Sequence, residues 1–402
     1  MFDPPDLVFE FSTLQYAKRP LDPSGEAQQF SQDLRGGALM PAPDRVRWRF
    51  IASILSVLIF LPPDYTLGAN RYSWVEIGPL PAGSGIIRGL SDNGDVAGRS
   101  GYLHGTKTRA FVQTAGGTTE QIGVLLGGEN SRAIAVNNYQ QVVGFSNTQT
   151  SMRAFLWSRE TGVQDLGTLP GDSSSKAYAI NDANQIVGSS SGAGGIRAFL
   201  WNRNGGMREI TGLPGADYTE ALAINSSGQI VGASGNSRIR HAFLWTPSGG
   251  TQDLGILPND VSSAANAIND YGKVVGVSVG PYGSRAFIWT SSEGMRDLGA
   301  LPGATETEAI AVNNRGDVVG ASGDGVSVRA FLWTSSSGIQ DLNAVVPADF
   351  PVVLEGAFGI NNRGQIIAIG NVINMPGQDR SGAQLHHSTP NRMFLLTPRS
   401  KS

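Results

Sequence analysis

The sequence predicts an all-β fold made of seven similar units, and three observations support this prediction. Of the 402 residues, 53 are glycine and only 16% are charged, a composition that favours many turns and short strands. The phrase Arg-Ala-Phe-Leu-Trp and its variants recur at a strict interval of 44 residues. A period of roughly 20 to 50 residues is typical of repeat arrays. Within each unit, short apolar runs alternate with turn-forming residues.

One unit, read from Val163 onward, contains four strand candidates. They are 163–167, 177–181, 185–188 and 197–201, and they are separated by segments rich in Gly, Ser, Pro and Asp. Four runs of four to six residues with four turn signals predict one four-stranded antiparallel meander.

The aromatic phrase predicts the core of each unit. Strands that are apolar on both faces are expected in a sheet covered on both sides, as when small sheets stack face to face. The tryptophans are therefore expected between neighbouring sheets, and an aromatic stack for sugars is the alternative interpretation. The phenylalanines are Phe111, Phe155, Phe199, Phe243, Phe287, Phe331 and Phe394, and the tryptophans are Trp157, Trp201, Trp245, Trp289 and Trp333.

A turn of the pattern Asn-x-x-Gly joins two strands of each unit. Gly or Asn in the fourth place tolerates the positive φ that a tight hairpin requires. Gln140 takes this place in one unit, where we expect backbone strain. The segment 92–95 also resembles a calcium loop, but it lacks the loop spacing and the closing Glu.

The order of the phrases predicts how the array ends. Seven copies of four strands suit a seven-bladed β-propeller with four-stranded antiparallel blades. The array opens with the strand 74–78 and ends with the strand 393–396, and each lacks its usual hairpin partner. Pairing of these N- and C-terminal strands would close the ring and remove both exposed edges. A linear solenoid is the structural alternative.

The N-terminal region predicts secretion. Basic residues at 45–49 precede a twelve-residue apolar run at 50–61, followed by Pro62 and Pro63, which is the layout of a secretory signal peptide. We expect a signal peptide at 40–69, starting at Met40, and an over-extended or disordered segment at 1–39. The seven-repeat domain then covers 70–398, with a tail at 399–402. An uncleaved anchor is the alternative. We expect an extracellular or periplasmic monomer with no stable membrane span after cleavage.

Composition excludes several classes of function. The net charge of −3 and pI of about 5.9 disfavour a nucleic-acid partner. The absence of cysteine excludes disulfides, thiolate metal sites and cysteine nucleophiles. The four histidines show no metal-binding or catalytic spacing, and no phosphate-binding glycine motif with its lysine occurs. We therefore assign no cofactor, no metal and no catalytic residue.

Departures from the repeat are the candidate binding residues. The position before the Ala-x-Ala strand changes from unit to unit, as Arg132, Lys176, Glu220, Ala264, Glu308 and Gly356. Variation on a constant frame is how a repeat protein encodes recognition, although a solvated rim gives the same pattern. The seventh unit is 19 residues longer than the others, and its inserted loop carries His386 and His387. A solvated surface loop is the alternative for these histidines.

A second set of residues precedes the Ala-Phe phrase. It could form a cationic ring, but cross-strand ion pairs with carboxylates such as Asp165 or Asp297 are the preferred interpretation. The set is Arg109, Arg153, Arg197, His241, Arg285, Arg329 and Arg392.

These phrases resemble the HAF repeat family of extracellular repeat proteins, which is named for a His-Ala-Phe phrase. Residues 241–243 have the sequence His-Ala-Phe. The phrases Asp-Leu-Gly-x-Leu-Pro-Gly and Ala-Ile-Asn-x-x-Gly-Gln-Ile-Val-Gly are also similar to those of this family. The resemblance covers about 74–398 and implies secretion and a β-rich array. It implies no activity or catalytic residue.

Two functions remain open from the sequence. The first is a secreted, non-enzymatic binding or scaffold module for a glycan, a cell-envelope component or a protein. The second is a secreted polysaccharide hydrolase or lyase that uses an acidic pair such as Glu220 and Glu308.

Overall fold

The computed structural model describes residues 71–78, 80, 85–101, 107–371 and 392–399. The chain divides into two units, Met1–Thr66 and Leu67–Ser402, and all described residues belong to the second. They form an all-β fold of 28 strands with one short 3-10 helix, η2 (Leu342–Ala344). Among the described residues, no helix is long and apolar enough to cross a membrane.

Three of the sheets have four strands each. The first joins both ends of the described chain, in the order β1, β28, β27, β26. Its strands are β1 (Tyr72–Glu76), β26 (Val353–Ile360), β27 (Ile366–Asn371) and β28 (Arg392–Pro398). The second has β2 (Gly85–Leu90), β3 (Val96–Ser100), β4 (Arg109–Gln113) and β5 (Thr119–Gln121). The third has β6 (Ser131–Val136), β7 (Val142–Asn147), β8 (Met152–Ser158) and β9 (Gly162–Asp165).

Two further sheets have eight strands each. One contains β10 (Asp172–Ile180), β11 (Ile186–Gly192), β12 (Gly195–Asn202), β13 (Gly206–Ile210), β14 (Tyr218–Ile224), β15 (Ile230–Gly235), β16 (Arg240–Thr246) and β17 (Gly250–Gly255). The other contains β18 (Ser262–Ile268), β19 (Val274–Gly280), β20 (Gly283–Thr290), β21 (Gly294–Asp297), β22 (Glu306–Val312), β23 (Val318–Gly323), β24 (Val328–Thr334) and β25 (Gly338–Asp341).

The described strands thus form five sheets, which corrects the expectation of seven separate four-stranded sheets. In each eight-stranded sheet, one parallel bridge joins two antiparallel groups of four strands: Ile196 with Tyr218, and Ser284 with Glu306. A glycine precedes each bridge. A Cβ atom on Gly195 would lie 2.2 Å from the Asp217 carbonyl oxygen, so only glycine permits this approach of the two groups.

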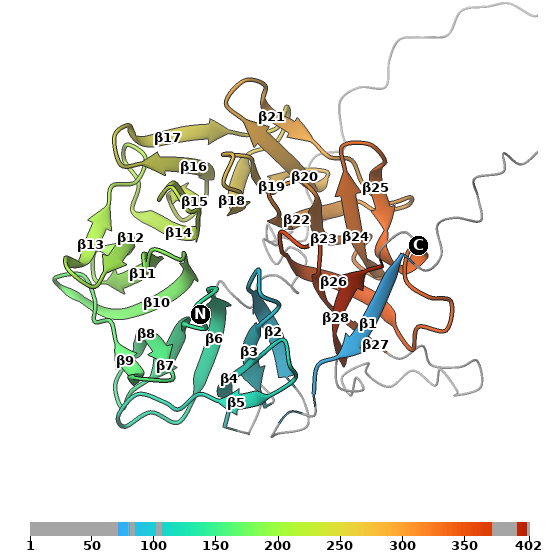
Figure 1. Ribbon diagram of the computed structural model, residues 1–402. Coiled ribbons are helices and arrows are strands. Elements are labelled where there is room, and N and C mark those ends of the chain that lie inside the picture. The colour runs from blue at the N-terminus through green and yellow to red at the C-terminus, as the bar shows by residue number, and fades with distance from the viewer. Residues whose placement is uncertain (1–70, 79, 81–84, 102–106, 372–391, 400–402) are drawn as a thin grey trace, which may run out of the picture. The chain divides into compact units, whose positions relative to one another are not determined.

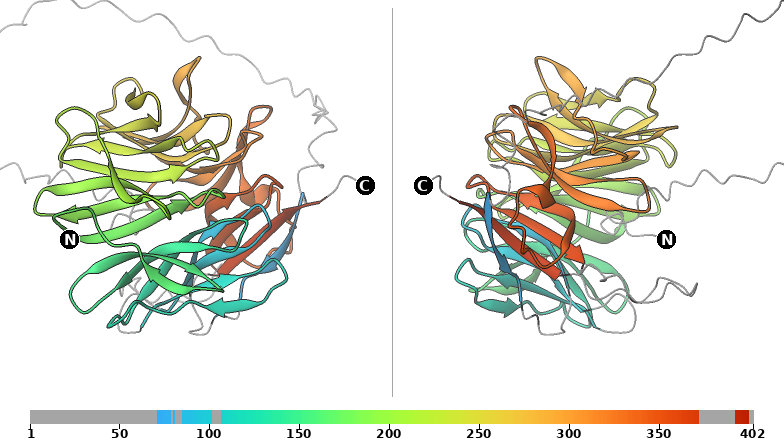
Figure 2. Two further views of the ribbon diagram at one scale, coloured as in Figure 1. Left: turned by 60° about the vertical axis from the view of Figure 1, so that its left-hand side comes forward. Right: turned by 90° about the vertical axis from the view of Figure 1, so that its right-hand side faces the viewer.

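The first and last described strands pair as the order of the phrases predicts. β1 runs antiparallel to β28 from the pair Tyr72–Pro398 to the pair Glu76–Phe394. Figures 1 and 2 show the blue β1 beside the red β28 in each view. The Arg392 side chain donates to both carboxylate oxygens of Glu76, at 2.8 and 2.6 Å, and this hydrogen bonding lowers the pKa of Glu76. The pairing covers an edge that β28 would otherwise expose.

The core lies between successive groups of four strands. The seven repeated phenylalanines are fully buried on the third strand of each group. Each of the five repeated tryptophans packs in a hydrophobic cluster that also contains residues of a neighbouring group. Side chains of both facing groups therefore interdigitate and exclude water.

The first strand of each group contacts the first strand of the next group. These seven strands, which we call the inner strands, are β2, β6, β10, β14, β18, β22 and β26. β26 in turn contacts β2, so the contacts among the inner strands are cyclic. Residues at equivalent positions of the inner strands therefore face a common region.

Candidate functional site

Every inner strand carries a β-bulge at the same position. The register with the second strand skips one residue in all seven groups, the x of the Ala-x-Ala phrase in the second to sixth groups and the equivalent Arg88 and Phe358 in the first and seventh. A bulge leaves its residue without a cross-strand partner and re-aims the side chain. We call this the bulge position, and its residues are Arg88, Ile134, Tyr178, Leu222, Asn266, Ile310 and Phe358.

The glycine of the Gln-Ile-Val-Gly phrase permits this bulge. In the third group, a Cβ atom on Gly188 would lie 1.9 Å from the carbonyl oxygen of Lys176. Five other groups repeat this close approach at the same place, at 1.9 to 2.1 Å. The seventh group has Ala368 there, and its inner strand carries an additional shift of register between Leu354 and Gly356. The repeated phrase thus fixes the backbone around each bulge.

Four of the predicted binding residues share one place on the inner strands, two residues before the bulge position. Arg132 lies on β6, Lys176 on β10, Glu220 on β14 and Glu308 on β22. With the bulge residues Arg88, Tyr178, Asn266 and Phe358, they form what we call the inner-strand cluster. His386 and His387 lie outside the described residues.

The bulge residue reaches the carboxylate of the next group in two places. Tyr178 donates to Glu220 Oε1 at 3.1 Å, and Asn266 donates to Glu308 Oε1 at 2.8 Å. Both pairs are separated by 42 residues, which reflects the same geometry in two copies of the repeat. The sequence interpretation missed the bulge residues, although the variation of x in Ala-x-Ala was visible.

Glu308 is a carboxyl group of this cluster whose pKa lies well above its ordinary value. Burial raises its pKa to about 7, and the hydrogen bond from Asn266 and the charge of Arg88 oppose this rise. Part of the residue stays accessible to solvent. Arg88 also lies over the Phe358 ring, 5.0 Å from its centroid. Glu308 can therefore exchange a proton at neutral pH.

Glu220 differs from Glu308, because two tyrosines bind it. The Tyr178 and Tyr218 hydroxyls both donate to its carboxylate, and the residue is only 4% exposed. Burial raises the pKa of each tyrosine, so both stay protonated donors. Glu220 and Glu308 lie on β14 and β22, with β18 between them. The predicted acidic pair is thus placed in two separate hydrogen-bond networks.

The cations of the cluster lie on the other inner strands. The Arg132 guanidinium and the Lys176 ammonium both lie against the buried Phe145 ring, at 5.5 and 5.3 Å from its centroid. Both side chains are partly exposed. A cation over an aromatic face is attracted by the ring. Phe145 thus contacts two positively charged side chains from adjacent inner strands.

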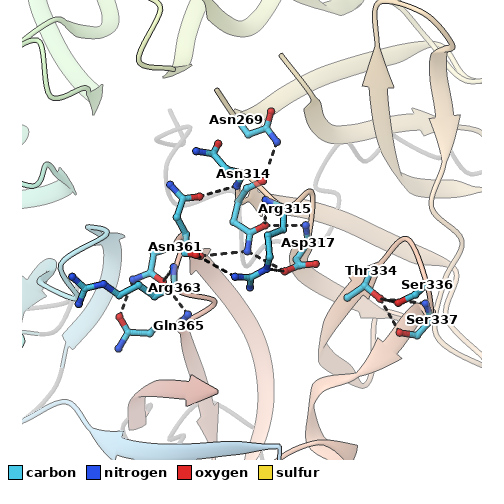
Figure 3. Close-up of polar contacts among 12 residues, drawn as sticks. Asn269, Asn314, Arg315, Asp317, Thr334, Ser336, Ser337, Asn361, Arg363 and Gln365 are labelled. Carbon is cyan, nitrogen blue, oxygen red and sulfur yellow. Dashed lines mark hydrogen bonds and ion pairs between the residues drawn. The ribbon is translucent and has the colours of Figure 1, made fainter. Parts of the chain in front are cut away.

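A ring of hydrogen bonds surrounds the turns at the ends of the inner strands. The first asparagine of each Asn-x-x-Gly turn donates its side chain to the backbone carbonyl of the equivalent residue in the next turn. Asn361 donates to Ser91 at 3.0 Å, and Asn93 of that turn contacts Asn138 of the following one. Figure 3 shows the Asn269, Asn314 and Asn361 part of this network.

The turn itself follows the prediction from the sequence. The fourth residue has positive φ in all seven turns, including 59° at Gln140 and 58° at Asn184. Among the described residues, no group of three or more His, Cys, Asp or Glu could hold a metal ion. The calcium-loop interpretation of 92–95 therefore gains no support.

The residues before the Ala-Phe phrase lie on the third strand of each group, and Arg197 also reaches the inner strand β10, where its guanidinium lies 2.9 Å from Asp172 Oδ2. Four of them form the expected ion pair with a carboxylate of the adjoining outer strand, as Arg285 does with Asp297 at 3.3 Å, and His241 is hydrogen-bonded to Asp253 at the equivalent place. Arg109 donates to the Glu129 carbonyl, and Arg153 to Ser151 Oγ at 3.2 Å. These residues do not form a cationic ring, because each is fixed to its own sheet or loop.

The fold is similar to that of solved β-propeller enzymes. Virginiamycin B lyase from Staphylococcus aureus has a TM-score of 0.52 and 13% identity, over 81% of this chain and 99% of that chain. An oligogalacturonate lyase has a TM-score of 0.50 and 11% identity, over 82% and 96%. At these identities the likeness shows the fold alone, so the chain has a β-propeller fold. No protein-family model and no curated protein sequence matches it.

Proposed function

We propose that this chain is a secreted seven-bladed β-propeller that binds an extracellular ligand at the inner-strand cluster without changing it chemically. The ligand is a glycan, a cell-envelope component or a protein. Each group of four strands is one blade, and the parallel bridges are local contacts between adjacent blades. Secretion through a signal peptide near 40–69 and membership of the HAF repeat family are parts of this proposal.

One observation carries the proposal. Seven bulges occur at the same register position, five of the seven bulge residues are partly exposed, and the residues there differ in charge and size while the frame is constant. Residues without a cross-strand partner are free to vary without loss of the sheet. A binding surface needs this combination of a rigid frame and variable side chains.

A glycan array probed with residues 70–402 tests binding. We expect retention of a limited set of glycans, reduced for the double variant R132M/K176M and unchanged for R159M, whose side chain is 63% exposed on the turn between β8 and β9. Retention that is equal for all three proteins would place binding elsewhere. N-terminal sequencing of the native protein tests the signal peptide.

A lyase or hydrolase is the second candidate. The pKa of Glu308 of about 7 suits a general acid or base, and Arg88 and Asn266 lie close enough to affect it. Two of the proteins with a similar fold are named as lyases. A release of unsaturated sugar products, measured by ultraviolet absorbance and abolished by E308Q, would favour this candidate over simple binding.

A further inference from the structure

The third residue of each Asn-x-x-Gly turn is exposed to solvent, whereas the first is buried. This holds in all seven groups, and the identity of the third residue changes from group to group. Exposed residues that vary on a repeated frame are the places where a repeat protein contacts a partner. The turns therefore form a candidate interaction surface apart from the inner-strand cluster. We call the seven third residues the turn face, and they are Asn93, Tyr139, Ala183, Ser227, Tyr271, Arg315 and Arg363.

Hydrogen bonds between neighbouring turns hold the turn face in place. Besides the contacts of the first asparagines, the second residue of one turn binds the second residue of the next, as the Asn138 backbone N–H donates to Asp182 Oδ1 at 3.0 Å. Four further pairs of neighbouring turns repeat this bond, at 2.8 to 3.0 Å. Figure 3 shows Arg315 and Arg363 on two of these linked turns. A surface that is rigid before binding loses little conformational entropy when a ligand docks on it.

Two tyrosines of the turn face extend into solvent. Tyr139 is 70% exposed and Tyr271 is 77% exposed, and neither side chain has a hydrogen bond or a ring contact with another described residue. They belong to the second and fifth groups, and the two turns between them carry the small residues Ala183 and Ser227 at the same position. Since these small side chains are much shorter than a phenol ring, both rings project beyond the residues between them. The ring faces are open to a ligand that lies across these four turns.

The charged groups of these four turns are two carboxylates, Asp182 and Asp270, and both residues are exposed. Asp182 accepts from the Asn138 backbone and side chain, one bond to each oxygen, and Asp270 accepts from the Ser226 backbone and the Asn314 side chain in the same way. Each carboxylate oxygen has a second lone pair, so both groups can accept from a ligand hydroxyl. Burial opposes the ionisation of Asp270, but its hydrogen bonds outweigh this effect and lower its pKa. Two ionised carboxylates disfavour an anionic ligand here.

We infer that these four turns bind a neutral saccharide chain, with sugar rings stacked on Tyr139 and Tyr271 and hydroxyl groups donating to Asp182 and Asp270. A pyranose ring has a face of C–H groups, which the negative face of an aromatic ring attracts, and an edge of hydroxyl donors. The four turns from the second to the fifth group offer partners for both. This surface is separate from the inner-strand cluster and does not depend on the function proposed there.

A protein partner is the competing occupant, because tyrosine and arginine are both common where proteins bind one another. The arginines of the turn face, however, are bound to its own frame. Arg315 pairs with Asp317 at 2.9 Å, and Arg363 donates to the backbone and side-chain oxygens of Asn93 at 3.4 and 3.3 Å. The tyrosines are thus the open contact groups of this surface, which favours a saccharide over a protein.

Calorimetry with linear hexasaccharides tests the inference. The neutral probes are cellohexaose, maltohexaose, xylohexaose and chitohexaose, and hexagalacturonate is the charged comparison. We expect at least one neutral probe to bind, with affinity reduced about tenfold or more in Y139A and in Y271A, and hexagalacturonate to bind at least about tenfold more weakly. Y282A is the matched control and should bind as the unaltered protein does. Tyr282 is 90% exposed on the turn between β19 and β20, at the opposite end of β19 from Tyr271.

Each contrary result overturns the inference in a distinct way. If no neutral probe binds, the saccharide class is wrong, and a protein is the occupant that remains. If Y139A and Y271A bind as the unaltered protein does, or if Y282A loses as much affinity as they do, the two tyrosines are not the binding groups. If hexagalacturonate binds as tightly as the neutral probes, the ligand is not selected for neutrality.

The double variant R132M/K176M separates this inference from the proposed function. It should keep the binding of the neutral probe, because both substitutions lie on the inner strands β6 and β10 and not on the turns. A loss of this binding would assign the saccharide to the inner-strand cluster, which would support the proposed function and overturn the inference. Far-ultraviolet circular dichroism of each variant identifies any loss caused by misfolding.

Discussion

Replacing Glu308 by glutamine should stabilise the protein relative to the unaltered chain at alkaline pH. At acid pH the replacement should have little effect on stability. The pKa of Glu308 is about 7 in the fold, against its ordinary value of 4.5, and burial is the main cause. Each pKa unit corresponds to about 1.36 kcal/mol, so the ionised carboxylate destabilises the fold by roughly 3 kcal/mol. Because this pKa is raised, the stability linked to the proton is fully present below pH 4.5 and is lost as pH rises through 7.

Glutamine isolates this effect because it keeps the shape and the oxygen that accepts from Asn266. The difference in unfolding free energy between E308Q and the unaltered protein should therefore grow by roughly 3 kcal/mol between about pH 4 and about pH 8. Urea denaturation followed by tryptophan fluorescence measures it. E293Q, at a side chain that is 62% exposed, controls for the loss of one surface negative charge.

If the difference in unfolding free energy between E308Q and the unaltered protein is the same at both pH values, the reasoning is refuted. It would mean that Glu308 ionises as easily in the fold as in the unfolded chain. N266A provides an independent check, because Asn266 lowers the pKa of Glu308 by donating to it. Removal of this donor should shift the loss of stability to higher pH.

Three further predictions concern the frame, and urea denaturation measures each. Gln140→Gly should stabilise the protein by about 0.5–1 kcal/mol, because Gln140 has a φ of 59°, whereas Gly272→Ala should destabilise it by about 1–2 kcal/mol; equal effects would contradict the role of φ. Asn225→Ala should destabilise it by about 1–3 kcal/mol, since it removes the hydrogen bond of 3.1 Å from Asn225 to the Asn269 carbonyl, which then accepts only from Gly272, and the side-chain acceptor of the Gln229 backbone N–H; a loss below about 0.5 kcal/mol would contradict this. Deletion of 1–77 should destabilise the fold and promote association through the edge of β28, whereas deletion of 1–70 should not.

Much of the repeated β-sheet framework could be predicted because every repeat contains the same sequence phrases. The buried Phe column, the positive-φ turns and the pairing of the first with the last strand all follow from phrases in the sequence. The number of sheets could not be predicted, because each parallel bridge depends on one backbone approach at a glycine such as Gly195.

The candidate site could be predicted only in part. Strict alternation along β10 would put Ala177 and Ala179 on the same face. The bulge at Tyr178 changes this, and the two alanines pack in different clusters, with the preceding and the following group. The ring of asparagines was hidden for a related reason: the sequence shows a turn residue, but its partner is the turn of the next repeat. Contacts between repeats need the three-dimensional arrangement.

The bulges explain how one frame can serve binding without loss of stability. A residue at the bulge position makes no pair in the ladder, and the alanines that flank it supply the packing in each group from the second to the sixth. Replacement there, as between Tyr178 and Asn266, changes the size and the hydrogen-bonding group at the bulge and leaves the buried phenylalanines in place. Under the proposed binding function, ligand choice therefore depends on the residues that vary between repeats, and stability depends on those that recur. Chains with the same phrases but other residues at these positions should consequently bind other ligands.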